Sequence, residues 1–162
     1  MITKHGSYHF SAVLELMLTA ILRPFSRMTK EQFGRFDPRQ RCFTHACSLV
    51  TAIWSFRTFS HVRLESWLVH PLGTSAYIAL REAEDAPTRM DILVRVCQCL
   101  HEMQVSLPLA TGVLSGIHAA FLKYKLPVPE YMKKYFELLQ YRKDGLMHHA
   151  VVVLLPSSTE VG

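Results

Sequence analysis

The chain has 162 residues, of which 49% are hydrophobic and 19% charged, and its formal net charge is +5 at pH 7. These fractions exclude a disordered chain, because disordered chains lack the apolar residues that a core requires. The length is typical of a single domain with one continuous core. The four cysteines do not resemble the disulfide framework of a small secreted domain, so we expect a reducing, intracellular setting.

Targeting and membrane signals are absent from the sequence. Residues 1–5 lack the apolar core and small-residue cleavage site of a secretory signal. The most apolar segment, residues 12–22, is interrupted by Glu15 and Thr19 and is shorter than the roughly 20 residues that span a bilayer. We therefore expect no membrane contact.

The positive charge lies in two loose clusters. The first comprises Arg23, Arg27, Lys30, Arg35, Arg39 and Arg41, and the second comprises Lys123, Lys125, Lys133, Lys134, Arg142 and Lys143. Acidic residues are mixed into both clusters, which favours solvated helix faces as their role. Contact with a polyanion is the alternative interpretation.

The first predicted helix covers about residues 7–27. Polar side chains recur every four residues at Ser11, Glu15, Thr19 and Arg23, and apolar side chains cover the remaining circumference. A helix that is apolar over most of its surface is typically central and buried. Pro24 predicts that the regular helix ends or kinks near residue 22 or 23.

The middle of the chain predicts a connector followed by two helical regions. Residues 26–40 carry turn signals at Gly34 and Asp37–Pro38, and a 3.6-residue apolar period then predicts a helix over about 39–60. A third region runs from about 62 to 84, where Pro71 either kinks the helix or starts a second one.

The C-terminal half predicts three further helices and a tail. Thr88 is the expected N-cap of a helix that reaches residue 103, and Ser106 is the expected N-cap of a helix with Pro108 in its first turn. A sixth helix is predicted over about 130–141, with one side lined by Tyr131, Tyr135, Phe136 and Leu139. The sequence thus predicts an all-α domain over residues 1–143, about six helices in an irregular bundle, followed by an irregular tail over 144–162.

Motifs for catalysis are missing, so we expect neither an enzyme nor a bound cofactor. The sequence contains no GxSxG, GxGxxG, P-loop or HExxH motif. Cys97 and His101 are four residues apart and could bind zinc from one helix face. Because Cys97 lies beside Val96 and Leu100, a buried structural thiol is favoured, and we expect no metal site.

Aromatic residues concentrate in the predicted middle helices. Those considered for a site are Trp54, Phe56, Trp67 and Tyr77. Core packing is the favoured explanation for them. The alternative is that they form the wall of an apolar ligand pocket between helices.

Four short motifs, in order, carry a family resemblance over about residues 8–126. They are Tyr8-His9-Phe10 continuing to Arg23-Pro24-Phe25, Cys42-Phe43-Thr44-His45-Ala46-Cys47, Trp67-Leu68-Val69-His70-Pro71-Leu72, and Leu100 to Met103 with Leu107-Pro108-Leu109-Ala110. Together they resemble the regulatory region, called the middle homology region, of fungal transcription factors with a binuclear zinc cluster. The resemblance implies a helical, nuclear regulatory domain that modulates transcription and, in some members, responds to small molecules.

Two departures from that family shape the expected function. Its DNA-binding zinc cluster needs six closely spaced cysteines, whereas this chain has four without that spacing, so we expect no direct DNA binding. The family region is also longer, so we expect this chain to be its C-terminal part, either a fragment or a degenerate gene product. Its expected partners are proteins of the transcription machinery, a second copy of itself, or a small apolar ligand.

An incomplete domain would have exposed apolar faces. If covering helices are missing, Val13, Leu16 and Trp54 become exposed and the chain is expected to self-associate. The alternative to a transcription regulator is a free-standing helical adaptor or small-molecule-binding module, for which a cytoplasmic location is expected.

Overall fold

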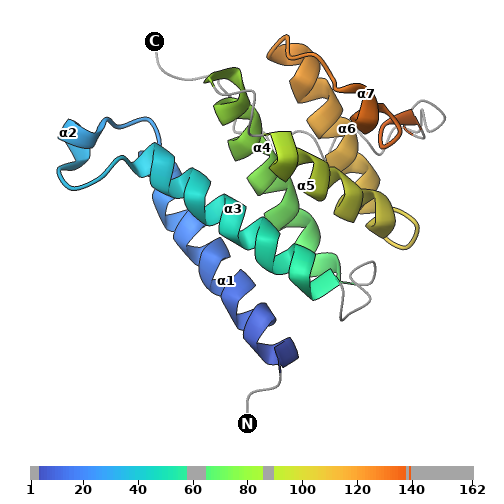
Figure 1. Cartoon of the computed structure of the whole chain (residues 1–162), viewed down its shortest axis with the longest axis horizontal. Coiled ribbons are helices and arrows are strands. Elements are labelled where there is room, and N and C mark those ends of the chain that lie inside the picture. Colours follow the sequence, from blue (N-terminus) through green and yellow to red (C-terminus); the bar gives the residue numbers. More distant parts are fainter. Residues whose placement is uncertain (1–3, 58–64, 86–89, 138, 140–162) are drawn as a thin grey trace.

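The computed structural model describes residues 4–57, 65–85, 90–137 and 139. Within these ranges the chain forms seven α-helices and two short 3-10 helices and no strand (Figure 1). The all-α bundle predicted from the sequence is therefore confirmed. The predicted N-cap Thr88 and the predicted tail over 144–162 lie outside the described residues.

The helices form a bundle in which α4 is central. Helix α1 (Lys4–Leu22) runs along α3 (Pro38–Arg57) at one side of the molecule. Helix α4 (Val69–Asp85) packs against α3, and also against α5 (Met90–Met103) and α6 (Pro108–Lys123) on the opposite side (Figure 1). The core is made of fully buried aliphatic and aromatic side chains from α3 to α6, including Leu49, Ile53, Leu72, Leu80, Leu93, Leu100, Leu114, Ile117 and Phe121.

Small side chains explain the central position of α4. Every residue from Pro71 to Ala76 is buried, and this stretch includes Gly73, Ser75 and Ala76. Because such residues project little from the helix, neighbouring helices can approach α4 on several sides. Burial all around a helix is thus achieved here by small residues rather than by high hydropathy.

The prediction that the N-terminal helix is central and buried is wrong. Helix α1 lies at the periphery and packs along α3, while Phe10 and Met17 remain 71% and 57% exposed. The polar positions face inward instead: Thr19 is buried and donates its hydroxyl hydrogen to the carbonyl oxygen of Glu15 at 2.8 Å. Internal hydrogen bonding makes the polar stripe compatible with a buried interface, and hydropathy alone does not reveal this.

Proline and aspartate mark the starts of two helices. Asp37 Oδ1 accepts hydrogen bonds from the backbone N–H of Arg39 at 2.8 Å and of Gln40 at 3.1 Å, so it caps α3. Pro71 lies in the first turn of α4, after the 3-10 helix η3 (Ser66–Leu68), so of the two interpretations of Pro71 the start of a helix is confirmed.

The expected N-cap at Ser106 is one residue too early. Leu107 is the N-cap of α6 and Pro108 is its first residue. A residue before proline is driven into extended backbone, and Leu107 has φ −127° and ψ 98°. Proline at the first helical position therefore fixes the cap at the residue just before it.

The segment expected to be a connector, residues 26–40, contains one short helix, and another short helix precedes it. The 3-10 helix η1 (Arg23–Phe25) follows α1 directly, and the one-turn helix α2 (Lys30–Phe33) begins with a capping box between Thr29 and Gln32. Gly34 ends α2 with φ 95°, a left-handed conformation that glycine adopts without strain. The turn signal at Gly34 is confirmed, although the segment as a whole is more regular than predicted.

The last helix is shorter than the predicted range of 130–141. Helix α7 spans Glu130–Lys133, and the chain then continues with hydrogen bonds of the i→i+3 type, such as Tyr135 N–H to the Met132 carbonyl at 3.0 Å. Tyr135 and Phe136 are buried as expected, but Tyr131 is 57% exposed. The ring of Phe136 stacks on His118 of α6 with 4.9 Å between centroids, which holds this segment on the bundle.

Candidate functional site

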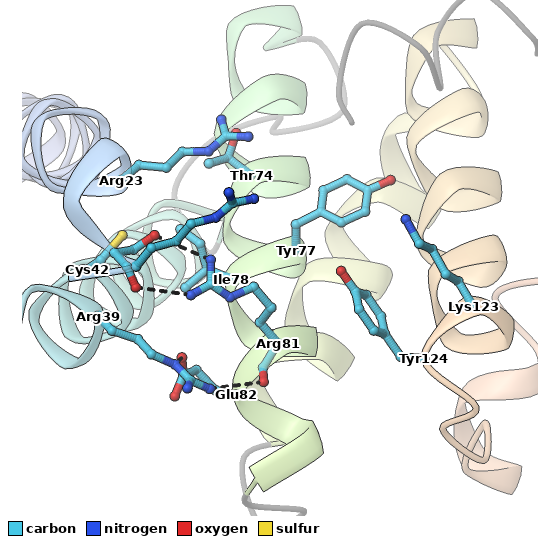
Figure 2. Close-up of a pocket in the computed structure, with 12 residues that line it drawn as sticks. Arg23, Arg39, Cys42, Thr74, Tyr77, Ile78, Arg81, Glu82, Lys123 and Tyr124 are labelled. Atoms are coloured by element: carbon cyan, nitrogen blue, oxygen red, sulfur yellow. Dashed lines mark hydrogen bonds and ion pairs between the residues drawn. The ribbon is translucent and has the colours of Figure 1, made fainter. Parts of the chain in front are cut away.

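A concave site lies between the end of α1, α3, α4 and the end of α6 (Figure 2). Its volume is about 180 Å³. The residues that line it are Arg23, Ser26 and Arg27 after α1, Arg39 and Cys42 of α3, Thr74, Tyr77, Ile78, Arg81 and Glu82 of α4, and Lys123 and Tyr124 at the end of α6. We call this site the basic pocket, because five of these side chains are cationic and one is anionic.

One face of α4 forms the floor of the basic pocket. Thr74, Tyr77, Ile78, Arg81 and Glu82 are spaced three or four residues apart and therefore lie on one side of the helix. The opposite faces of α4 are packed into the core, so this helix holds the polar floor rigidly against the apolar interior.

An ion pair between α3 and α4 closes one end of the pocket. Arg39 Nε donates to Glu82 Oε1 at 2.6 Å, and an Arg39 terminal nitrogen donates to the carbonyl oxygen of Arg81 at 3.4 Å. The Asp37 cap at the start of α3 fixes the backbone of Arg39, and the Glu82 side chain is nearly buried. Arg39 and Glu82 therefore neutralise each other within the site.

Arg81 joins α4 to the turn after α1. Its two terminal nitrogens donate to the side-chain oxygen and to the carbonyl oxygen of Ser26, both at 3.3 Å (Figure 2). These contacts are made to neutral acceptors, so the charge of Arg81 is not compensated by them. The guanidinium thus positions Ser26 and at the same time adds positive potential to the pocket.

Cys42 lies against the arginines but is not suited to be a nucleophile. Burial raises the pKa of the Cys42 thiol above its ordinary value, while the Arg81 and Arg23 guanidinium groups act in the opposite direction. The thiol donates to the carbonyl oxygen of Thr19 at 3.8 Å. Because the raised pKa keeps the thiol protonated at neutral pH, Cys42 acts as a packing residue.

Two phenol groups and one lysine form the side of the pocket near α6. Figure 2 shows the Tyr77 ring extending from α4 toward Lys123, with Tyr124 next to them. Burial raises the pKa of the Tyr77 phenol, and the nearby Tyr124 adds to this effect. The Tyr77 hydroxyl therefore stays protonated at neutral pH and can donate a hydrogen bond into the pocket.

Of the four aromatic residues considered from the sequence, Tyr77 alone lines the basic pocket. Phe56 is 4% exposed in the core, and Trp67 donates its indole N–H to Glu65 at 3.0 Å. Trp54 lies on the face of α3 toward α5, where the guanidinium carbons of Arg57 and Arg95 are 4.7 Å and 5.9 Å from its ring centroid. Trp54, Phe56 and Trp67 therefore have structural contacts and do not line the basic pocket.

The pair Cys97 and His101 does not form a metal site in the described part of the chain. Cys97 is fully buried, and burial strongly raises the pKa of its thiol. His101 Nδ1 lies 2.8 Å from the amide nitrogen of Gln104. Within the described ranges there is no group of three or more potential metal ligands.

The residues of the basic pocket were not recognised as one site from the sequence. Arg23, Arg27 and Arg39 belong to the first basic cluster and Lys123 to the second, and helix packing brings the two clusters together around α4. A usable signal was present in α4, whose residues 74, 77, 78, 81 and 82 repeat at helical spacing on one face.

The chain is a helical-bundle domain with a basic pocket, and this description rests on its own geometry. No protein-family model, curated protein or solved structure matches the chain. None of the helices in the described segments is long and apolar enough to cross a membrane.

Proposed function

We propose that the chain is a transcription-regulatory helical domain that binds a ligand in the basic pocket and carries no catalytic activity of its own. The observation that supports this proposal most directly is the composition of the pocket. Its walls come from four separate segments, the turn after α1 and helices α3, α4 and α6. A ligand that contacts all four segments stabilises one arrangement of them, which is how binding in one place changes the surface elsewhere.

The chemistry of the pocket residues favours binding over catalysis. The cysteine is protonated, and the carboxylate of Glu82 is engaged by Arg39. General bases and nucleophiles need an accessible, unprotonated group near the substrate. Arginine and tyrosine side chains are instead typical of recognition, because they donate several hydrogen bonds from fixed positions.

The regulatory setting comes from the sequence motifs between residues 8 and 126 that resemble the middle homology region of fungal zinc-cluster regulators. In that setting the domain works in the nucleus through contacts with other proteins. A DNA-binding module would have to come from elsewhere, because the cysteines Cys42, Cys47, Cys97 and Cys99 lack the spacing of a zinc cluster.

A tethering experiment tests the regulatory role. The whole chain is fused to an unrelated DNA-binding domain, and the transcription of a reporter with the matching sites is measured. We expect the fusion to change reporter transcription, and the variant Arg39→Gln, which leaves Glu82 without its partner, to weaken that change. An unchanged reporter with a stable, nuclear fusion protein would refute the regulatory role.

A free-standing small-molecule-binding module or adaptor is the second candidate function, and the basic pocket favours it equally. It predicts an unchanged reporter together with ligand binding by the purified chain. The reporter experiment therefore separates the two candidates, and the binding experiment described next tests the ligand that both share.

A further inference from the structure

The basic pocket has a surplus of positive charge. Arg39 is paired with Glu82, and Arg81 is held by neutral oxygens of Ser26. Among the described residues, no carboxylate forms an ion pair with Arg23, Arg27 or Lys123. The pocket therefore gathers four cationic groups beyond the one that Glu82 neutralises.

An anion would balance this gathering of like charges. Arg23 is half-buried, and its guanidinium and that of Arg81 both act on the Cys42 thiol between them. Charges that are partly removed from water repel each other more strongly than charges in bulk solvent. An anion in the pocket would replace this repulsion by attraction.

The donors in the pocket match the oxygens of a phosphate or carboxylate group. Guanidinium groups donate two parallel hydrogen bonds to such oxygens. Figure 2 shows the Arg23 guanidinium beside Thr74, and the phenols of Tyr77 and Tyr124 on the opposite side next to Lys123. The two ends differ in character, with arginines on one side and aromatic rings on the other.

The size of the pocket limits the ligand. Its volume of about 180 Å³ is below the roughly 300–1,000 Å³ that pockets for drug-sized molecules measure. A small metabolite fits this volume, whereas a dinucleotide cofactor does not.

We propose that the basic pocket binds a small organic anion, whose phosphate or carboxylate group is held by Arg23 and Arg27 and whose body lies against Tyr77 and Tyr124, beside Lys123. This inference rests on the proposed function, because it names the ligand class of the same site. It changes one expectation from the sequence: the expected ligand is anionic instead of apolar.

Binding by the purified chain tests the proposal. Thermal unfolding and calorimetry are measured with phenyl phosphate, inorganic phosphate and citrate at fixed ionic strength, with sodium chloride and phenol as controls. We expect the anions to raise the unfolding temperature, phenyl phosphate more than inorganic phosphate because its ring can contact the tyrosines, and the controls to have no effect. No stabilisation by any of the three anions would overturn the proposal.

Charge-matched variants show whether the effect comes from this pocket. Arg23→Gln and Arg27→Gln are expected to weaken phenyl phosphate binding by roughly tenfold or more, the effect of removing a hydrogen bond to a charged group. Arg35→Gln and Lys125→Gln remove the same charges at exposed positions outside the pocket and should bind like the wild type. Equal loss in all four variants would overturn the proposal, because a general surface charge would then be responsible.

The unfolding temperature of each variant without anion shows whether a loss of binding comes from a folding defect. Because removing one crowded cation relieves repulsion, Arg27→Gln without anion should unfold at the same temperature as the wild type or higher. A clear loss of stability would contradict the surplus of charge on which the proposal depends. Binding of duplex DNA or of phosphatidic acid vesicles without binding of phenyl phosphate would also overturn it.

The reporter and binding experiments can fail separately. Phenyl phosphate binding with an unchanged reporter keeps this inference and refutes the regulatory role. A regulated reporter without anion binding keeps the regulatory role and refutes this inference.

Discussion

Glu15 of α1 and His45 of α3 form a polar contact across the interface between these two helices, with Glu15 Oε2 2.7 Å from His45 Nδ1. Both side chains are about four-fifths buried, at 20% and 23% exposure. The contact lies on the inward polar stripe of α1 and fixes which face of that helix meets α3. It explains how a helix with exposed phenylalanine and methionine side chains still has one defined orientation.

A double-mutant cycle measures this contact. Glu15→Gln and His45→Gln should each lower the free energy of unfolding, and the coupling between them should be about 1 kcal/mol, as for partly buried pairs. Chemical denaturation of the two single variants and the double variant provides the values. Additive effects would show that the pair contributes nothing beyond its separate contacts.

Stability should depend on pH through Arg57 and Glu102. The hydrogen bond from Arg57 is the main cause that lowers the pKa of the Glu102 carboxyl below its ordinary value of 4.5. Since the folded-state pKa is lower than the unfolded-state pKa, the stabilisation is complete above pH 4.5 and is lost as the pH falls through the folded-state value. Denaturation from about pH 6 to about pH 3 should thus show a steeper loss for the wild type than for Glu102→Gln. Arg57→Gln should reduce the same difference, and an unchanged difference in that variant would contradict the assigned cause.

Two leucines of α6 provide a matched test of the core. Leu114 is fully buried, whereas Leu122 on the same helix is 67% exposed. Leu114→Ala should cost roughly 2–5 kcal/mol of unfolding free energy because it leaves a cavity. Leu122→Ala should stay within about 0.5 kcal/mol of the wild type. Equal costs, measured by denaturant unfolding, would mean that α6 presents a different face to the core.

The cysteines should differ in reactivity toward a thiol reagent. Burial raises the pKa of Cys99 to about 12 and that of Cys97 still further, so both thiols are protonated and shielded in the folded chain. Cys47 is partly exposed on α3. Maleimide labelling followed by peptide mapping should modify Cys47 first, and Cys97 and Cys99 only in denaturant. The variant Cys47→Ser should lose the fast phase, and early labelling of Cys97 would refute its burial.

The exposed apolar side of α1 should influence association more than stability. Met17→Gln and Ile21→Gln replace exposed side chains and should change the free energy of unfolding by less than about 0.5 kcal/mol. Ala12→Gln, at a buried position facing the bundle, should destabilise by roughly 1–3 kcal/mol. Sedimentation velocity should show weaker self-association for the two exposed variants, and unchanged association would exclude this side of α1 as its cause.

Helix positions were largely predictable because they depend on local patterns. The apolar period and the prolines at 24, 38, 71 and 108 predict where helices start and end, since proline has fixed backbone preferences. The orientation of α1 was not predictable, because both of its sides are apolar and only the partner residue His45 decides between them. Val13, Leu16 and Trp54, which were expected to be exposed in an incomplete domain, are partly buried, and the exposed residues are Phe10, Leu14, Met17 and Ile21.

The basic pocket was not predictable as a whole because its residues are distant in sequence. Arg23 and Lys123 meet through the packing of α1, α3, α4 and α6, and no local pattern contains that arrangement. The helical spacing of Tyr77 and Arg81 can be read from the sequence. The sequence does not show that the other helices leave this face of α4 uncovered, so the spacing alone does not predict a pocket.

The one-sided attachment of α1 has a consequence for hydrogen exchange. Its extensive packing is to α3, whereas α4 is held by three other long helices. Amide hydrogens of α1 should therefore exchange through a sub-global opening that leaves α3 to α6 closed, with a lower opening free energy than global unfolding. Because Arg23 adjoins the end of α1, an anion held by Arg23 in the basic pocket would slow exchange in α1 more than in the centre of the bundle.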